Sequence, residues 1–189
     1  MEHFGVVLAG GQSSRMGVDK ADLMWHQHTL LQHMLQRLRA SLCQHVLISR
    51  NHHQGINDRF KHKGPLAGID AVLQQLPEHC LLTVIPVDMP LLESAAIIHL
   101  QTYAANTRRS VYYSQSFLPC IIVVNNSLRT YIEQQLSSDG NYSIKGMLCF
   151  IEAEQLLHPE PNRLCNTNTP QQWDAVINTV TNNHTHAVR

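Results

Sequence analysis

The chain has 189 residues, 43% of them hydrophobic, which suits one domain with a sizeable core. Lys plus Arg and Asp plus Glu each total 14, so no general field attracts nucleic acid or an anionic membrane surface. The five cysteines are widely spaced without a C-x-x-C pair, which argues against a disulfide framework or a zinc knuckle and favours the reducing cytoplasm. We therefore expect one cytoplasmic domain over residues 1–189, with a flexible tail over about 181–189 and no membrane segment.

Short apolar runs alternate with amphipathic segments through the first half of the chain. Residues 4–9 form an apolar run that leads into a glycine-rich turn, which is typical of a buried strand. Thr29 can cap a helix over 30–42, where leucines and a methionine recur at three- and four-residue intervals. The next predicted elements are a strand, a helix that begins at a Gly-Pro pair and a second buried strand, over 45–49, 64–76 and 80–87.

The second half continues with shorter elements. The pattern predicts a helix over 94–103 and strands over 110–114 and 120–124. Asn126 or Ser127 can cap a helix that ends at 136. The remaining predicted elements are a strand over 147–151 and a last helix that begins at Thr169 and Pro170.

Strands that alternate with helices predict an α/β fold, with a three-layer arrangement of a mainly parallel twisted sheet and helices on both faces, as in Rossmann-like domains. Ligands of such sheets bind beyond the carboxyl ends of the strands. The glycine-rich turn follows the first predicted strand, and Asp88 follows the long apolar strand. We therefore expect both features at one edge of the sheet.

The segment L-A-G-G-Q-S-S-R-M-G-V-D-K, residues 8–20, combines a glycine turn with two cations. Gly10 and Gly11 allow a close backbone approach to a ligand, and Arg15 and Lys20 can hold phosphate oxygens. The spacing fits neither G-x-G-x-x-G nor the P-loop, because valine and not lysine follows the last glycine. The segment is therefore either a third type of nucleotide loop or an ordinary turn with solvated cations.

This loop resembles that of the molybdenum cofactor guanylyltransferases and related MobA-like nucleotidyltransferases. The resemblance extends to three further motifs in the family's order, which are G-P-L-A-G at 64–68, P-V-D-M-P at 86–90 and N-T-N-T-P at 166–170. Together the four motifs span nearly the whole chain. The resemblance implies the same α/β nucleotidyltransferase fold.

The resemblance also implies an activity, the Mg²⁺-dependent transfer of GMP from GTP to the terminal phosphate of molybdopterin (Mo-molybdopterin). Transient contacts with other cofactor-biosynthesis proteins and with molybdoenzymes are expected as well. Two alternatives stay open. One is another nucleotidyltransferase reaction, with CTP and molybdopterin or with a nucleoside triphosphate and a sugar or polyol phosphate. The other is a non-catalytic GTP-binding protein that delivers the cofactor.

The resemblance assigns roles to the residues of the first and third motifs. It implies catalytic roles for Arg15, Lys20 and Asp88, with the two cations neutralising the triphosphate and Asp88 binding Mg²⁺. A hard cation with oxygen ligands also suits this aspartate on physical grounds, although an aspartate before proline can simply form a turn. The expected backbone contacts to the guanine nucleotide come from Leu8, Ala9, Gly10 and Gly11.

Other positions match the family less directly. A nucleotide-contacting aspartate of the family corresponds to Asp58, and a family asparagine falls at Ser49, with Asn51 as its substitute. Asn166 and Asn168 either contact the acceptor or form the turn that caps the last helix. On the acceptor side, segments 116–119 and 138–143 lack the histidine and arginine residues of the family pattern.

Overall fold

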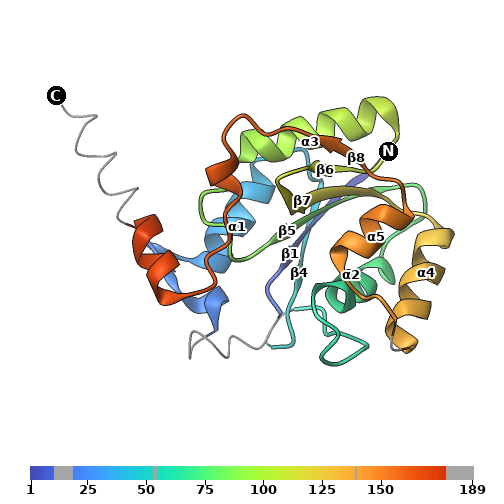
Figure 1. The fold of residues 1–189 in the computed structure, drawn as a ribbon, viewed down its shortest axis with the longest axis horizontal. Helices are drawn as coiled ribbons and strands as arrows, with labels where there is room; N and C mark the ends of the chain where they lie inside the picture. Colours follow the sequence, from blue (N-terminus) through green and yellow to red (C-terminus); the bar gives the residue numbers. More distant parts are fainter. Residues whose placement is uncertain (11–18, 53–54, 139, 178–189) are drawn as a thin grey trace.

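The computed structural model of the protein describes residues 1–10, 19–52, 55–138 and 140–177. A six-stranded sheet in the order β4-β1-β5-β7-β6-β8 forms its centre, beside a small β2-β3 sheet (Figure 1). The strands are β1 (His3–Leu8), β2 (Met24–Trp25), β3 (His28–Thr29), β4 (His45–Ser49), β5 (Leu81–Pro86), β6 (Val111–Tyr113), β7 (Ser116–Val123) and β8 (Glu154–Leu156). The helices are α1 (Leu30–Arg39), α2 (Pro65–Leu73), α3 (Ser94–Thr107), α4 (Asn126–Ser137) and α5 (Ile144–Phe150), with short 3₁₀ turns η1 (Lys20–Asp22) and η2 (Pro161–Leu164).

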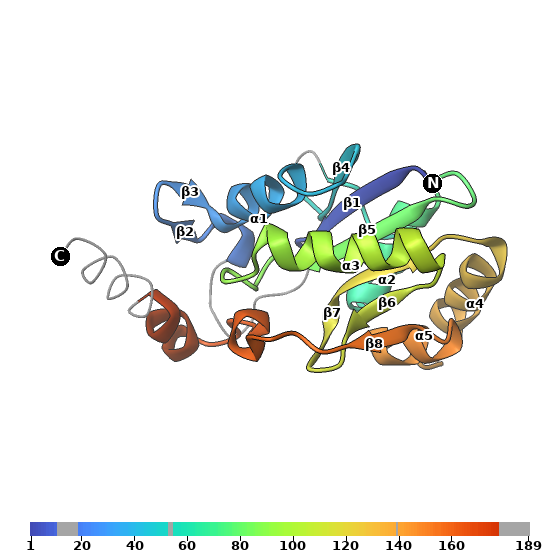
Figure 2. The same cartoon turned by 90° about the horizontal axis from the view of Figure 1, so that it is seen from above.

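Helices cover both faces of the large sheet. Helices α1 and α3 pack against each other and against one face, whereas α2, α4 and α5 lie on the other face (Figures 1 and 2). Helix α2 contacts β1 and β4, and α5 contacts β7. This arrangement confirms the predicted three-layer α/β fold.

The sheet is mainly parallel, as predicted. Strand β1 is parallel to β4 and β5, and β6 is parallel to β8, whereas β7 is antiparallel to both of its neighbours. The reversal at β7 has a local cause, because Tyr113 already pairs with Ser116. Such a short connection joins antiparallel strands, since a parallel pair needs a crossover of a dozen residues or more.

The starts of α1 and α2 form where the sequence predicts them. The cap of α4 is Asn125 and not the predicted Asn126 or Ser127, because the Asn125 side chain accepts a hydrogen bond from the Leu128 N–H at 2.9 Å. At the start of α1 the Thr29 hydroxyl accepts a hydrogen bond from the Gln32 N–H, and the Gln32 side chain accepts one from the Thr29 N–H. This reciprocal pair is a capping box. Helix α2 starts at Pro65 after Gly64, whose φ of 66° lies in the region that favours glycine.

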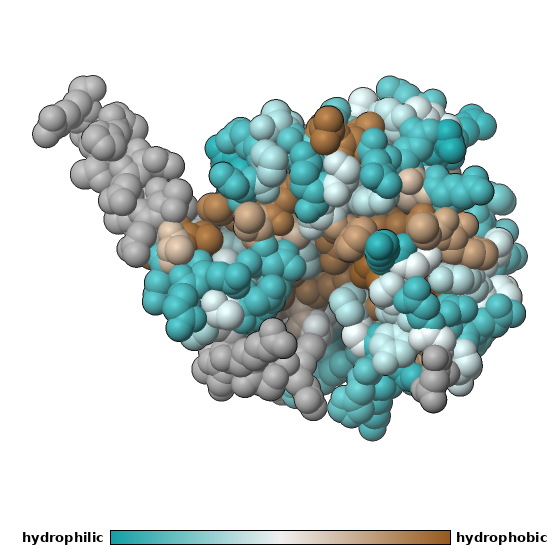
Figure 3. Space-filling view, viewed as in Figure 1, coloured by the Kyte–Doolittle hydropathy of each residue, from teal (hydrophilic) through white to brown (hydrophobic). Residues whose placement is uncertain are grey.

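The centre of the core is β5, all of whose residues are buried. A strand buried on both faces has the continuous apolar sequence that residues 80–87 show. Figure 3 also shows hydrophobic residues gathered in a hollow across the middle of one face of the molecule.

The predicted strand over 147–151 is wrong, because this segment belongs to α5 and the turn that ends it. The Ser143 side chain accepts a hydrogen bond from the Gly146 N–H at 3.0 Å and so caps a helix. Met147 and Leu148 are buried, whereas Phe150 is exposed. This is a helical stripe and not the alternation of a strand, and a short apolar run does not distinguish the two.

The last predicted helix is confirmed over residues 170–177, where the Thr169 hydroxyl accepts a hydrogen bond from the Gln172 N–H at 3.2 Å. The predicted flexible tail over 181–189 lies outside the described residues. Within the part of the chain that the structure describes, no helix combines the length and apolar character needed to cross a membrane.

Candidate functional site

The carboxyl ends of β1, β4 and β5 meet at one edge of the sheet. Leu8 pairs with Ser49 on one side and with Pro86 on the other. Hydrogen bonds continue past the strands, from the Ala9 N–H to the Ser49 carbonyl at 2.8 Å and from the Val87 N–H to the Leu8 carbonyl at 3.0 Å. The strand ends that carry the predicted nucleotide loop and the predicted metal aspartate are therefore neighbours.

Three side chains from distant parts of the sequence meet at this edge. The Lys20 ammonium lies 2.9 Å from Asp88 Oδ2 and 2.7 Å from Asn168 Oδ1. The Lys20 and Asp88 side chains are each 15% exposed, so solvent screens their ion pair only in part. The structure thus brings together a cation, a carboxylate and an amide that the sequence places in three separate motifs.

Thr167 fixes the loop that carries Asn168, and sequence reasoning missed it. Its N–H and its hydroxyl both donate to the Asp88 carbonyl, at 2.8 and 3.2 Å, and the residue is only 2% exposed. Asn166, by contrast, is exposed. Thr167 lies between the two asparagines of N-T-N-T-P, so its position in this motif was the sequence signal that could have identified it.

A second group of predicted residues lies beside β4. The Asn51 side chain donates to Asp58 Oδ2 at 2.8 Å, and its oxygen accepts from the Asp58 N–H at 2.8 Å. A Cβ atom added at Gly10 would lie 3.9 Å from Asn51 Nδ2, so these residues border the first motif. Gly11 and Arg15 of that motif lie outside the described residues.

Ser49 faces the interior rather than the open edge. The residue is 1% exposed, and a Cβ added at Gly68 would lie 2.4 Å from its hydroxyl oxygen. Glycine at position 68 therefore lets α2 pack tightly against β4. The Ser49 group that faces the first motif is its carbonyl, which accepts the Ala9 N–H.

The segment that carries Asp58 is anchored by an ion pair that the sequence did not reveal. Arg59 donates to both oxygens of Asp70, from Nε at 2.8 Å and from Nη2 at 2.9 Å. Asp70 is 1% exposed on α2. A bidentate pair of this kind fixes the orientation of the two side chains as well as their distance, so it holds the segment after β4 against α2.

His33 of α1 supports the loop that follows Asp88. Its Nε2 lies 2.9 Å from the Pro90 carbonyl, and its ring packs near Trp25, which in turn contacts Trp173. Burial lowers the pKa of His33 below the ordinary histidine value, although the contact with the Pro90 carbonyl partly opposes this. The same cause lowers the pKa of His3.

These two histidines predict that acid destabilises the fold. Because the folded pKa values lie below the unfolded value of about 6.5, the unfolded chain binds more protons as the pH falls below that value, and stability is lost down to the folded pKa values. We expect the unfolding temperature of the wild type to fall between about pH 7.5 and pH 5. In a His33→Gln variant, whose amide can still donate to Pro90, the dependence should be shallower. An identical pH dependence of the two proteins would contradict this assignment.

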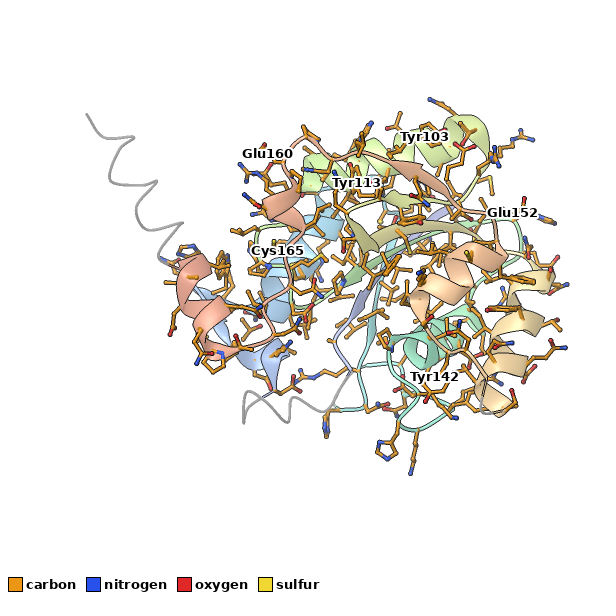
Figure 4. The ribbon with its side chains drawn as sticks, in the orientation of Figure 1. Tyr103, Tyr113, Tyr142, Glu152, Glu160 and Cys165 are labelled. Carbon is orange, nitrogen blue, oxygen red and sulfur yellow. The ribbon has the colours of Figure 1, made fainter. Side chains whose placement is uncertain are left out.

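A cavity of about 340 Å³ lies elsewhere, between the turn before β6, the start of α4 and the end of α5. Its lining includes Arg108, Asn125 and Glu152, which lie at the amino ends of the parallel strands. Glu152 and Cys165, which precedes the 166–168 loop, lie on opposite sides of Figure 4. The predicted site residues are therefore not the residues that line this cavity.

The mainly parallel sheet with a lysine–aspartate contact at its strand ends suits an α/β nucleotidyltransferase, and comparison with known proteins identifies the family. The model of the MobA-like NTP transferase domain matches residues 5–153. A molybdenum cofactor guanylyltransferase of Xanthomonas euvesicatoria pv. vesicatoria (strain 85-10) is 35% identical over 178 residues, which cover 92% of this chain and 93% of that protein. The chain therefore belongs to the MobA-like NTP transferase family.

Solved structures confirm the fold. Molybdopterin-guanine dinucleotide biosynthesis protein A of Archaeoglobus fulgidus superposes with a TM-score of 0.72 at 17% identity, covering 95% of this chain and 99% of that one. The 2-C-methyl-D-erythritol 4-phosphate cytidylyltransferase of Thermus thermophilus gives 0.64 at 14% identity, covering 91% and 95%. Lys20 and Asp88 lie within the matched family range, whereas Asn168 lies beyond it.

Proposed function

We propose that this chain transfers GMP from GTP to the terminal phosphate of molybdopterin (Mo-molybdopterin), with pyrophosphate as the second product. The proposal is supported by the 35% identical molybdenum cofactor guanylyltransferase, which matches nearly end to end. The observation that carries it is the contact of Lys20 with Asp88 and Asn168 at the carboxyl edge of the sheet. This is the edge at which α/β sheets bind their ligands.

Asp88 would hold the Mg²⁺ ion, because carboxylate oxygens are the hard ligands that this ion prefers. Asp88 Oδ2 contacts Lys20, and Asp88 Oδ1 accepts no hydrogen bond from the described residues, so one carboxylate can face a lysine and an ion together. When bound, Mg²⁺ would offset negative charge on the phosphates. The ion needs only one or two protein carboxylates, since substrate phosphates and water complete its shell.

The remaining work of the protein is to position the reactants. An oxygen of the acceptor phosphate forms a bond to the α-phosphorus of GTP as the bond from that phosphorus to the bridging β-phosphate oxygen breaks. The Lys20 ammonium balances the charge that collects on the departing pyrophosphate. The acceptor phosphate is already anionic near neutral pH, so no side chain has to act as a nucleophile or base.

We assign the other predicted residues by their place around this cluster. Asn51 and Asp58 hold each other beside Gly10, where they can read the edge of a purine base. Asn168 is exposed beside Lys20 and would contact the acceptor, while Thr167 fixes its loop. We also propose a cytoplasmic location and transient contacts with other cofactor-biosynthesis proteins and molybdoenzymes, in keeping with five free cysteines.

A substrate panel tests the proposal. Each of the four nucleoside triphosphates is incubated with Mg²⁺ and either molybdopterin or a sugar phosphate, and pyrophosphate release is measured. We expect release with GTP and molybdopterin, and little release when GTP, acceptor or Mg²⁺ is omitted. A preference for CTP or for a sugar phosphate would assign a different reaction of the same class. Binding of GTP without pyrophosphate release would instead indicate a delivery protein.

A further inference from the structure

Two consecutive residues at the end of β4 hold the chain on both sides of the glycine-rich segment. The Ser49 carbonyl accepts the Ala9 N–H at 2.8 Å, where the chain leaves β1. Arg50 Nη2 donates to Asp19 Oδ2 at 2.8 Å, where the chain enters η1. The positions of Ala9 and Asp19 are thus set by adjacent residues of one strand end.

Arg50 also binds the far end of the turn that carries Lys20. The same Nη2 donates to Asp22 Oδ2 at 2.7 Å. Asp19 caps this turn, because its Oδ1 accepts the Ala21 N–H at 2.9 Å. One guanidinium nitrogen therefore holds the acidic residue on each side of the Lys20–Ala21 pair.

The charges of this group favour a positioning role over phosphate binding. Two carboxylates already surround the single positive charge of Arg50, whose side chain is only 13% exposed. Because two carboxylates lie against one guanidinium, the group as a whole is net negative and attracts a triphosphate less than an arginine without such partners would. Without Arg50, both carboxylates would be uncompensated next to Lys20 and would compete with Asp88 for its ammonium.

We propose that Arg50 is a positioning residue that acts through Lys20. By holding Asp19 and Asp22, its guanidinium fixes the turn from which the Lys20 ammonium reaches Asp88. This inference rests on the proposed role of Lys20 as the cation that faces the triphosphate. It assigns to Arg50 no direct contact with substrate.

Pyrophosphate release by an Arg50→Met variant tests the proposal, because methionine removes the charge and keeps an apolar stem. We expect kcat/KM for GTP to fall roughly 10- to 100-fold, as misplacing a group by about 1 Å can cost 10²-fold. The matched control is Arg129→Met, since Arg129 donates to the Leu76 carbonyl at the other end of the sheet. This control should stay close to wild type.

The decisive measurement is the same Arg50→Met change in a Lys20→Met background. If Arg50 acts only through Lys20, the second change should lower kcat/KM little further. An equal loss in both backgrounds would overturn the proposal, because Arg50 would then act independently of Lys20. An Arg50→Met single variant with the kcat/KM of the wild type would also overturn it.

A second variant and a binding measurement separate the role of Arg50 from the proposed reaction. Asp22→Asn removes the negative charge of one partner of Arg50 at a side chain that is 63% exposed, so it should fold and show a smaller loss that also depends on Lys20. Binding of a fluorescent GTP analogue, measured without acceptor, should weaken in Arg50→Met. If the wild type binds the analogue but releases no pyrophosphate, the proposed reaction fails while the binding series still tests Arg50. Equal analogue binding by wild type and Arg50→Met would refute the positioning role.

Discussion

Replacing Asp88 with asparagine should lower pyrophosphate release from GTP by roughly 10²-fold or more, because Asp88 is the proposed metal ligand and loss of such a ligand removes several kcal/mol of transition-state stabilisation. The fold should survive. Asparagine has nearly the same shape, and its oxygen can still accept a hydrogen bond from Lys20. Thr167 binds the backbone carbonyl of residue 88, which the substitution leaves in place.

The measurement is turnover as a function of Mg²⁺ concentration, with thermal unfolding recorded for the same preparations. Asp88→Asn should require more Mg²⁺ for its residual activity. Asp174→Asn is the matched control, since Asp174 is exposed on the last helix and should leave turnover unchanged. Wild-type turnover in Asp88→Asn would remove the metal-binding assignment and with it the mechanism.

The sequence predicts the part of this site that depends on local pattern. A nearly continuous apolar run stopped by proline marks β5 and places Asp88 just after its end, and a glycine turn marks the end of β1. Parallel strands carry their ends to a common edge, so the fold class alone places both motifs at one edge. Their proximity also requires β1 and β5 to be adjacent, which the strand order provides. The contact of Lys20 with Asp88 agrees with that expectation.

The parts that escaped prediction depend on which distant segments meet. Nothing in the sequence around Arg50 shows that its guanidinium lies between Asp19 and Asp22. The Arg59–Asp70 pair could not be predicted for the same reason, because an aspartate inside an apolar helix pattern does not indicate which cation it binds. Charged groups interact at a distance that is set by the tertiary fold, whereas hydrophobic periodicity reports only local conformation.

Replacing Lys20 with methionine should lower kcat/KM for GTP by roughly 10²-fold, since removing one preorganised charge from a transition state commonly costs about 10²- to 10³-fold. In the proposed reaction the ammonium would face the phosphates both in the bound substrate and in the transition state, so we expect KM for GTP to rise as kcat falls. The apparent affinity for Mg²⁺ should not weaken, because Asp88 loses a competing cation. This opposite metal dependence separates Lys20→Met from Asp88→Asn.

The size of the stability change decides whether the loss of turnover by Lys20→Met is a catalytic effect. The Lys20 and Asp88 side chains are each 15% exposed, so their pair lies between a surface ion pair worth about 0–1 kcal/mol and a buried one whose disruption costs about 3–5 kcal/mol. A loss of about 1–2 kcal/mol would leave most molecules folded, because domains are typically stable by about 5–15 kcal/mol. Denaturant unfolding measures this directly. If the lost activity instead tracked the fraction of unfolded protein, Lys20 would hold the fold together and not the triphosphate.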